Sequence, residues 1–200
     1  MNFDDTRTTL KEIKRIFWLL LLAFIVLSFL SAVVLKDKTE YVQKIIQDFA
    51  ESKEHILETS GLKLALELFK NNMKASAFSV LLGFIPFLFL PSFTILLNAI
   101  ILGGFYQFFI QLPGTSPLMY FASILPHGII EIPAFLLAAS MGIYLCKELS
   151  KKLLRRPVKP IGETLRGIIA VLIYIILPML IVAALIEAFI TPYVMTQLFI

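Results

Sequence analysis

Residues 75–146 read ASAFSVLLGFIPFLFLPSFTILLNAIILGGFYQFFIQLPGTSPLMYFASILPHGIIEIPAFLLAASMGIYLC, with one charged residue, Glu131, and one histidine, His127, a helical turn before it. So long an uncharged stretch suits lipid, where helices of about 20 apolar residues cross the bilayer. An ionisable side chain in lipid costs about 2.5–3.5 kcal/mol on insertion scales, so such a residue usually has a role there. The stretch therefore predicts an all-α membrane protein and marks His127 and Glu131 as a candidate site.

The composition of the whole chain agrees with a polytopic membrane protein. Of the 200 residues, 58% are hydrophobic and 16% are charged, whereas a soluble protein of this length needs more polar surface. The first apolar run is too long for a signal peptide and is expected to remain as a transmembrane helix. We expect a single membrane domain over residues 1–200, a bundle of about five transmembrane helices at 16–35, 73–90, 92–112, 118–146 and 167–189.

Basic residues predict the orientation of this bundle. Residues 1–15 hold four Lys and Arg and residues 147–166 hold seven, whereas the seven in residues 36–74 are matched by seven acidic residues. Because cytoplasmic loops carry an excess of Lys and Arg, we expect a multi-pass plasma-membrane protein with a cytoplasmic N-terminus, a cytoplasmic loop at 147–166 and an external C-terminus. Topology thus explains the net charge of +4, and no nucleic-acid partner is expected.

The segment at 36–70 is predicted to lie outside the cell as an amphipathic helical segment. Apolar residues recur there at helical spacing between charged ones, at Tyr41, Val42, Ile45, Ile46 and Phe49. One face of the helix is therefore apolar. Such a helix either lies on the lipid and covers the bundle, or presents a docking face to a protein partner outside the cell.

The apolar run at 118–146 is too long for one straight span. Its 29 residues would extend about 44 Å as a helix, against a hydrocarbon core of about 30 Å. Pro126 and Gly128, with Pro133 close by, are expected to break the helix, because proline removes a backbone donor and glycine relaxes the chain. We therefore predict a short re-entrant element over 118–125 and a spanning helix from 128 to 147, with His127 at a sheltered helix start.

Small residues predict where helices pack closely. Ala134, Ala138 and Gly142 follow Glu131 at spacings of three, four and four, so all four share one helix face. Small residues let neighbouring helices approach each other. The predicted packing residues are Ala134, Ala138, Gly142, Ser76, Ser79, Gly83 and Gly103. A five-helix bundle need not bury every such stripe, so we also expect a homodimer besides contact with the lipid bilayer.

A polar cluster is expected in the outer half of the bundle. At 1.5 Å per residue, Glu131 lies about 24 Å and Glu187 about 30 Å from the inner boundary. These side chains either satisfy broken helix ends and one another, or bind a ligand, an ion or a partner. The candidate binding residues are His127, Glu131, Glu187, Asn72, Asn98, Gln107 and Gln111.

Four segments resemble the stage II sporulation protein M family of integral membrane proteins. They are FKNN at 69–72, LNAIILGG at 97–104, PHGIIEIPA at 126–134 and EAFITP at 187–192. The resemblance implies a multi-pass protein whose sporulation members work with a glycan-cleaving enzyme and a peptide-cleaving amidase. It thus implies the membrane part of a peptidoglycan-degrading machine, with partners on the extracytoplasmic side.

Known catalytic motifs are missing from the sequence. It contains no HExxH zinc-protease motif, no Gly-x-Ser-x-Gly elbow and no P-loop. A zinc site built from His127, Glu131 and Glu187 is an alternative, but we expect no enzyme activity and no cofactor. Two functions remain open: a non-catalytic scaffold that positions envelope partners, and a channel, transporter or lipid-handling protein that uses the buried His/Glu cluster.

Overall fold

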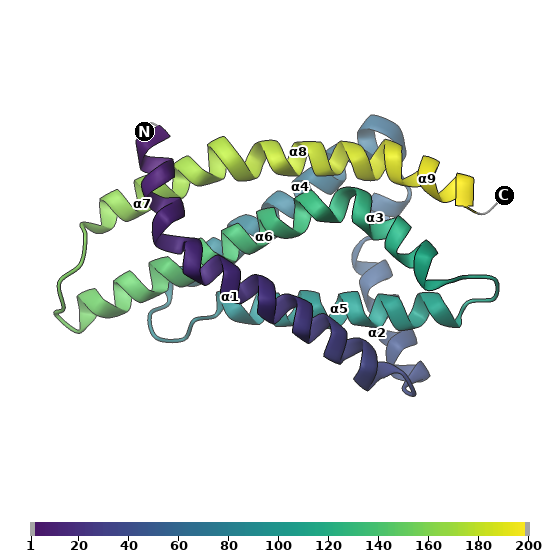
Figure 1. Cartoon of the computed structure of the whole chain (residues 1–200). Helices are drawn as coiled ribbons and strands as arrows, with labels where there is room; N and C mark the ends of the chain where they lie inside the picture. The colour runs from purple at the N-terminus through teal and green to yellow at the C-terminus, as the bar shows by residue number, and fades with distance from the viewer. Residues whose placement is uncertain (1–2, 199–200) are drawn as a thin grey trace. The chain divides into compact units, whose positions relative to one another are not determined.

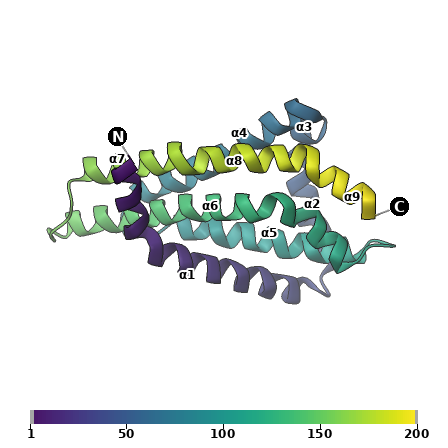
Figure 2. The ribbon, with the colours of Figure 1, turned by 45° about the horizontal axis from the view of Figure 1, so that its top comes forward.

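The computed structural model describes residues 3–198, and every regular element among them is helical (Figure 1). The chain begins with α1 (Phe3–Leu35), α2 (Thr39–Ser52), α3 (Glu54–Leu57) and α4 (Gly61–Leu81), which a short 3-10 turn at Leu82–Phe84 extends. It continues with α5 (Pro91–Gln111) and α6 (Pro117–Leu153), which the loop at 112–116 joins (Figure 2). Its last helices are α7 (Ile161–Val171), α8 (Leu177–Leu185) and α9 (Thr191–Leu198), with π-helical turns η2 (Leu172–Ile176) and η3 (Ile186–Ile190) between them. The predicted all-α class is confirmed.

Four stretches of the described chain are long and apolar enough to cross a membrane: Asp4–Leu35, Pro91–Gln111, Pro117–Leu153 and Ile161–Leu198. The expected span at 73–90 is not among them, so the count of five is not confirmed. The reason is that α4 carries Lys63, Glu67, Lys70 and Lys74 and ends at Leu81, after which residues 85–90 are not helical. The predicted helix in the 36–70 segment is present as α2.

The chain forms two compact units, which are described separately. Unit 1 comprises the described residues of Met1–Leu22, Asn71–Ile95 and Glu131–Leu180, and unit 2 those of Ala23–Lys70, Leu96–Ile130 and Ile181–Ile200. Helices α1, α4, α5, α6 and α8 each contribute residues to both units.

The core of unit 1 depends on small residues. Ala134 and Ala138 on α6 have no exposed surface. Gly142 lies so close to the Ser79 carbonyl oxygen that an added Cβ would approach it to 2.5 Å, and Gly83 in turn lies against the Gly142 backbone. The Ser79 hydroxyl also lies 3.1 Å from the Thr94 hydroxyl. The end of α4 and the middle of α6 are therefore in backbone contact, as small residues permit, and the start of α5 adds side-chain contacts through Pro91 and Thr94.

The non-helical segment of the basic region also belongs to unit 1. Residues 147–153 continue α6 and α7 begins at Ile161, so only 154–160 form the loop. There the Lys159 ammonium donates a hydrogen bond to the Glu12 carboxylate at 2.5 Å. That hydrogen bond raises the pKa of Lys159, because the carboxylate stabilises the charged form. At the same end, the Phe87 amide donates to the Ser150 hydroxyl at 2.8 Å.

In unit 2, helix α2 packs its apolar face onto α5. Val42 is fully buried, and the Phe49 and Phe105 rings meet edge to face with centroids 5.1 Å apart. Ile45 lies beside Gly104, where an added Cβ atom would be 3.6 Å from the Ile45 Cγ2 atom. The apolar face predicted for this segment therefore packs against α5, except for Tyr41, which is exposed like the opposite face.

The structure corrects the expected break in the fourth apolar run. Helix α6 is one unbroken α-helix over Pro117–Leu153, drawn as a single continuous ribbon in Figure 1. Neither Pro126 nor Pro133 ends it, and Gly128 and His127 lie inside the helix and not at its start. Proline removes one hydrogen bond and clashes with the carbonyl four residues earlier. The loss of that one hydrogen bond does not end a helix whose other backbone hydrogen bonds remain.

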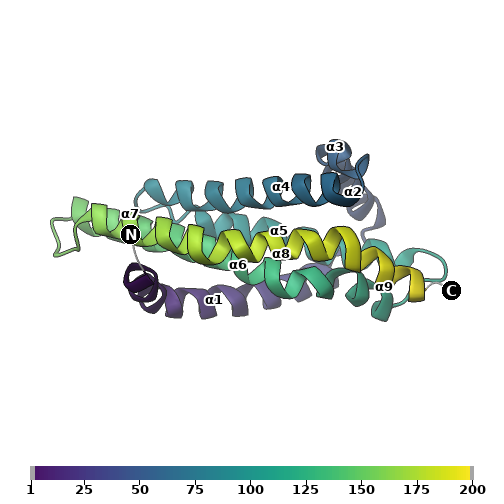
Figure 3. The same ribbon diagram turned by 90° about the horizontal axis from the view of Figure 1, so that it is seen from above.

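The last helical stretch accommodates its prolines differently. Residues 161–198 are helical throughout (Figure 3), but two of their turns are π-helical. Each π turn ends two residues before a proline, Pro178 after η2 and Pro192 after η3. The carbonyl that each proline ring would strike belongs to Tyr174 and to Ala188, inside those turns. The wider turn moves that carbonyl, so the two prolines account for the two π turns.

Candidate functional site

His127 meets the last helix within unit 2. Its Nδ1 atom lies 3.2 Å from the Thr191 hydroxyl, and its ligand atom and that of Glu187 lie within 4.8 Å of each other. Glu187 is part of η3, and Thr191 is the first residue of α9. Because a π turn displaces the side chains around it and is frequent at functional sites, η3 sets where Glu187 and Thr191 stand opposite α6.

Glu131 has a separate partner in unit 1. Its side chain is hydrogen-bonded to Asn72 of α4, and Asn72 also accepts a hydrogen bond from the Asn71 amide at 3.0 Å. The other carboxylate oxygen, Oε2, is buried and has no hydrogen-bond partner among the described residues. Buried polar atoms in proteins are nearly always paired, so this oxygen stands out as an acceptor for a proton, a cation or a partner group.

Helix α6 carries both His127 and Glu131, four residues apart in the sequence. Within unit 2, the His127 imidazole of α6 and the Glu187 carboxylate of η3 lie close together.

The other predicted binding residues do not join this pair. Gln107 of α5 donates its amide to the Ala32 carbonyl of α1 at 2.6 Å. Asn98 and Gln111 have exposed side chains. The depth argument places a residue along its helix, but it says nothing about the direction in which its side chain points around the helix axis.

Thr191 was not among the predicted site residues, although a signal for it was present. It stands directly before Pro192 in the segment EAFITP, and the π turn before that proline turns it towards His127. The predicted packing residues are also placed. Ser76, Ser79, Gly83, Ala134, Ala138, Gly142 and Gly103 are all buried. A homodimer would therefore have to use other surfaces.

Comparison with known proteins gives a family match and one distant relative. The family model described as "Stage II sporulation protein M" matches residues 17–192. A protein of Methanocaldococcus jannaschii, "Uncharacterized protein MJ0706", is 34% identical over 103 residues, which are 50% of this chain and 42% of that protein. The match thus spans less than half the length of that relative. No solved structure matches the chain.

Proposed function

The chain belongs to the stage II sporulation protein M family, and from this membership we propose that it is a non-catalytic integral membrane scaffold that recruits or positions partners of the cell envelope. The match covers residues 17–192, so the scaffold comprises nearly the whole chain. The partners that fit this family are enzymes acting on peptidoglycan outside the membrane. The proposal includes a plasma-membrane location and a homodimer.

The observation that carries the scaffold proposal is the exposed face of α2. The apolar side of this helix is held against α5 by Val42, Ile45 and Phe49. The opposite side presents charged and polar groups, namely Lys44, Gln47, Asp48 and Glu51, all exposed. A helix fixed on one side and charged on the other is suited to bind a partner by complementary charge, which governs specificity and the rate of encounter.

We expect that a charge swap on this face, Lys44→Glu with Asp48→Lys, releases the partner without disturbing the fold. The swap keeps the net charge of the face and changes only its pattern. A photo-crosslinking residue at Gln47 in full-length protein should capture an envelope protein with an external domain, and the swap should reduce that product at least about fivefold, as a loss of roughly 1 kcal/mol implies. The matched control is the swap Lys152→Glu with Glu163→Lys in unit 1, where both residues are exposed. Equal loss of the product in both swaps would contradict a docking face on α2.

The proposed orientation requires α4 to cross the membrane, although its charges make it the least apolar of the long helices. With 21 residues it extends about 31 Å, enough for the hydrocarbon core. The segment that follows it is bonded to the end of α6, through Phe87 to Ser150 and through the Cys146 thiol to the Ile85 carbonyl. If α4 crosses, the basic region at 147–166 shares the cytoplasmic side with the N-terminus, and α2 lies outside.

Cysteine labelling of intact cells tests this orientation. In a Cys146→Ser background we expect Glu54→Cys, before α4, to react with a membrane-impermeant maleimide, and Lys152→Cys to react only after the cells are opened. Both positions are exposed, whereas Cys146 itself is buried. Labelling of both positions from the same side would show that α4 does not cross the membrane.

One observation favours the alternative, a channel, transporter or lipid-handling protein. It is the buried and unpartnered Oε2 atom of Glu131, because unpaired carboxylates inside membranes mark ion and proton pathways. The two functions make opposite predictions for substitutions at this residue.

A further inference from the structure

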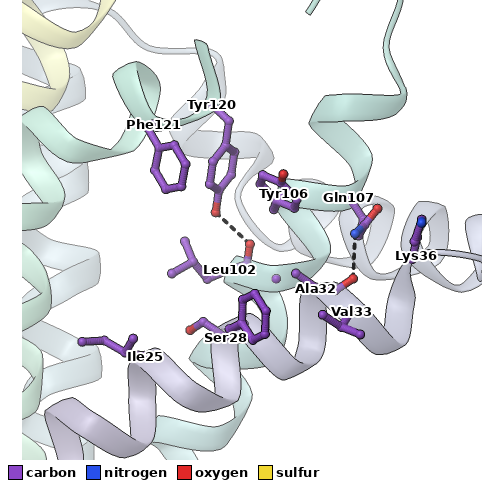
Figure 4. A pocket seen from close by; sticks show the side chains of 12 residues that line it. Ile25, Ser28, Ala32, Val33, Lys36, Leu102, Tyr106, Gln107, Tyr120 and Phe121 are labelled. Atoms are coloured by element: carbon purple, nitrogen blue, oxygen red, sulfur yellow. Dashed lines mark hydrogen bonds between the residues drawn. The ribbon is translucent and has the colours of Figure 1, made fainter. Parts of the chain in front are cut away.

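Unit 2 contains a groove between the ends of α1 and α5 and the start of α6 (Figure 4). It has a volume of about 650 Å³, within the range of small-molecule sites. Its wall is mostly aliphatic and aromatic, with Ile25 and Phe29 from α1, Leu102 from α5 and Phe121 from α6. Tyr106 and Tyr120 stiffen it, because their rings pack edge to face with centroids 5.1 Å apart.

Most polar side chains in this wall already donate hydrogen bonds to backbone carbonyls. The Gln107 amide donates to the Ala32 carbonyl, and the Tyr120 hydroxyl donates to the Leu102 carbonyl at 2.9 Å (Figure 4). The Ser28 hydroxyl donates to the Phe24 carbonyl at 2.8 Å. Lys36 is the one charged residue of the lining, and its side chain is exposed. An occupant of this groove is therefore apolar along its length and anionic at the Lys36 end.

The dimensions of the groove match one leaflet of a bilayer. It extends from Ile25 on α1 to Lys36, eleven positions further along the chain, a distance of about 16 Å at 1.5 Å per residue. That is close to half of a hydrocarbon core of about 30 Å. Lys36 directly follows the last residue of α1, Leu35, so the cation is placed where a helix leaves the apolar layer and where lysine meets lipid headgroups.

We propose that this groove binds one anionic glycerophospholipid, with an acyl chain along α1 and the headgroup phosphate against Lys36. The apolar wall is suited to the acyl chain, and the single cation explains the preference for an anionic headgroup. The inference rests on the groove alone and holds whether or not the protein is a scaffold. Its occupant would also fill an opening between helices that the chain itself leaves unfilled.

Native mass spectrometry of the full-length protein in mild detergent tests the proposal, with phosphatidylglycerol and phosphatidylcholine of the same chain length as probes. We expect phosphatidylglycerol to be retained about fivefold better, because one lysine near an anionic lipid is worth about 1 kcal/mol. Lys36→Gln should remove this preference, and Lys38→Gln, two residues away and outside the groove, should keep it. Equal retention of both lipids by the unaltered protein would overturn the assignment.

A second pair of variants tests the position of the lipid acyl chain. Val33 lines the groove and Val34 does not, while both side chains are more than half exposed, so neither substitution disturbs a packed core. Val33→Trp should lower retention of both lipids at least about fivefold, and Val34→Trp should not. If Val33→Trp leaves lipid retention unchanged, or changes only the oligomeric state, the groove is not a lipid site; the second result would make it an interface between copies.

Discussion

Gly142→Leu is expected to disrupt unit 1, with a loss of about 3 kcal/mol or more in the free energy of unfolding. A Cβ atom at this position would lie 2.5 Å from the Ser79 carbonyl oxygen and 2.7 Å from the Pro91 ring. The first neighbour is backbone, which cannot turn away as a flexible side chain does. At about 2–4 °C per kcal/mol for a chain of this size, the melting temperature in detergent should fall by about 6 °C or more.

Gly162→Leu is the control for this prediction. Gly162 belongs to the same unit and to a helix, α7, but a Cβ atom there would have no neighbour within 4 Å. Its replacement should change stability by no more than about 0.5 kcal/mol, as is usual for open surface positions. If both variants have the same melting temperature, the close contact at Gly142 is not a determinant of the fold. A change in oligomeric state without a change in melting would instead place Gly142 between copies of the chain.

The sequence is sufficient to predict the helical class and the amphipathic α2, because both follow from apolar periodicity along one helix. It also indicates which residues are small enough for close packing. The partner of each small residue does not follow, since Gly142 meets Ser79, 63 positions earlier. Such contacts depend on which helices become neighbours, and periodicity within one helix carries no information about that.

The predicted break at Pro126 failed for a related reason. A proline inside a helix always removes one backbone hydrogen bond, but the helix can accommodate this loss in more than one way. Helix α6 stays α-helical, whereas the last helix forms a π turn before Pro178 and again before Pro192. Which response occurs depends on packing against other helices. The π turn at η3 then sets the position of Glu187 and Thr191, which no spacing rule for an ideal α-helix would give.

The candidate site was predicted in part. His127 and Glu131 are conspicuous because they are ionisable groups in an apolar stretch, and Glu187 was added by depth. Depth along the membrane normal did not distinguish Gln107, whose side chain is hydrogen-bonded to α1, from Gln111, whose side chain is exposed. The direction around the helix axis decides that difference.

Glu131→Leu is expected to cost about 1 kcal/mol of stability if Glu131 has a structural role. The change leaves the Asn72 amide without its acceptor, and a polar group left unpaired in this way costs about 1–3 kcal/mol. Removal of the unpartnered Oε2 atom offsets part of that cost, so the lower end of the range applies. Adding Asn72→Leu should recover part of the loss, because it removes the unpaired Asn72 amide, although it also removes the acceptor of the Asn71 amide. Thermal melting of the single and double variants measures this coupling.

Glu131→Gln separates the scaffold from the transport alternative, because it keeps a hydrogen-bonding side chain of the same shape and removes the carboxylate. In a scaffold we expect unchanged melting and unchanged capture of the external partner through α2. In a protein that moves protons or cations, the carboxylate itself is needed, so function should be abolished while the fold stays intact. A Glu131→Gln variant that is more stable but inactive would also favour the transport alternative, since strained polar groups at functional sites commonly reduce stability. Loss of partner capture in Glu131→Gln at unchanged melting temperature would therefore contradict a purely structural role for this residue.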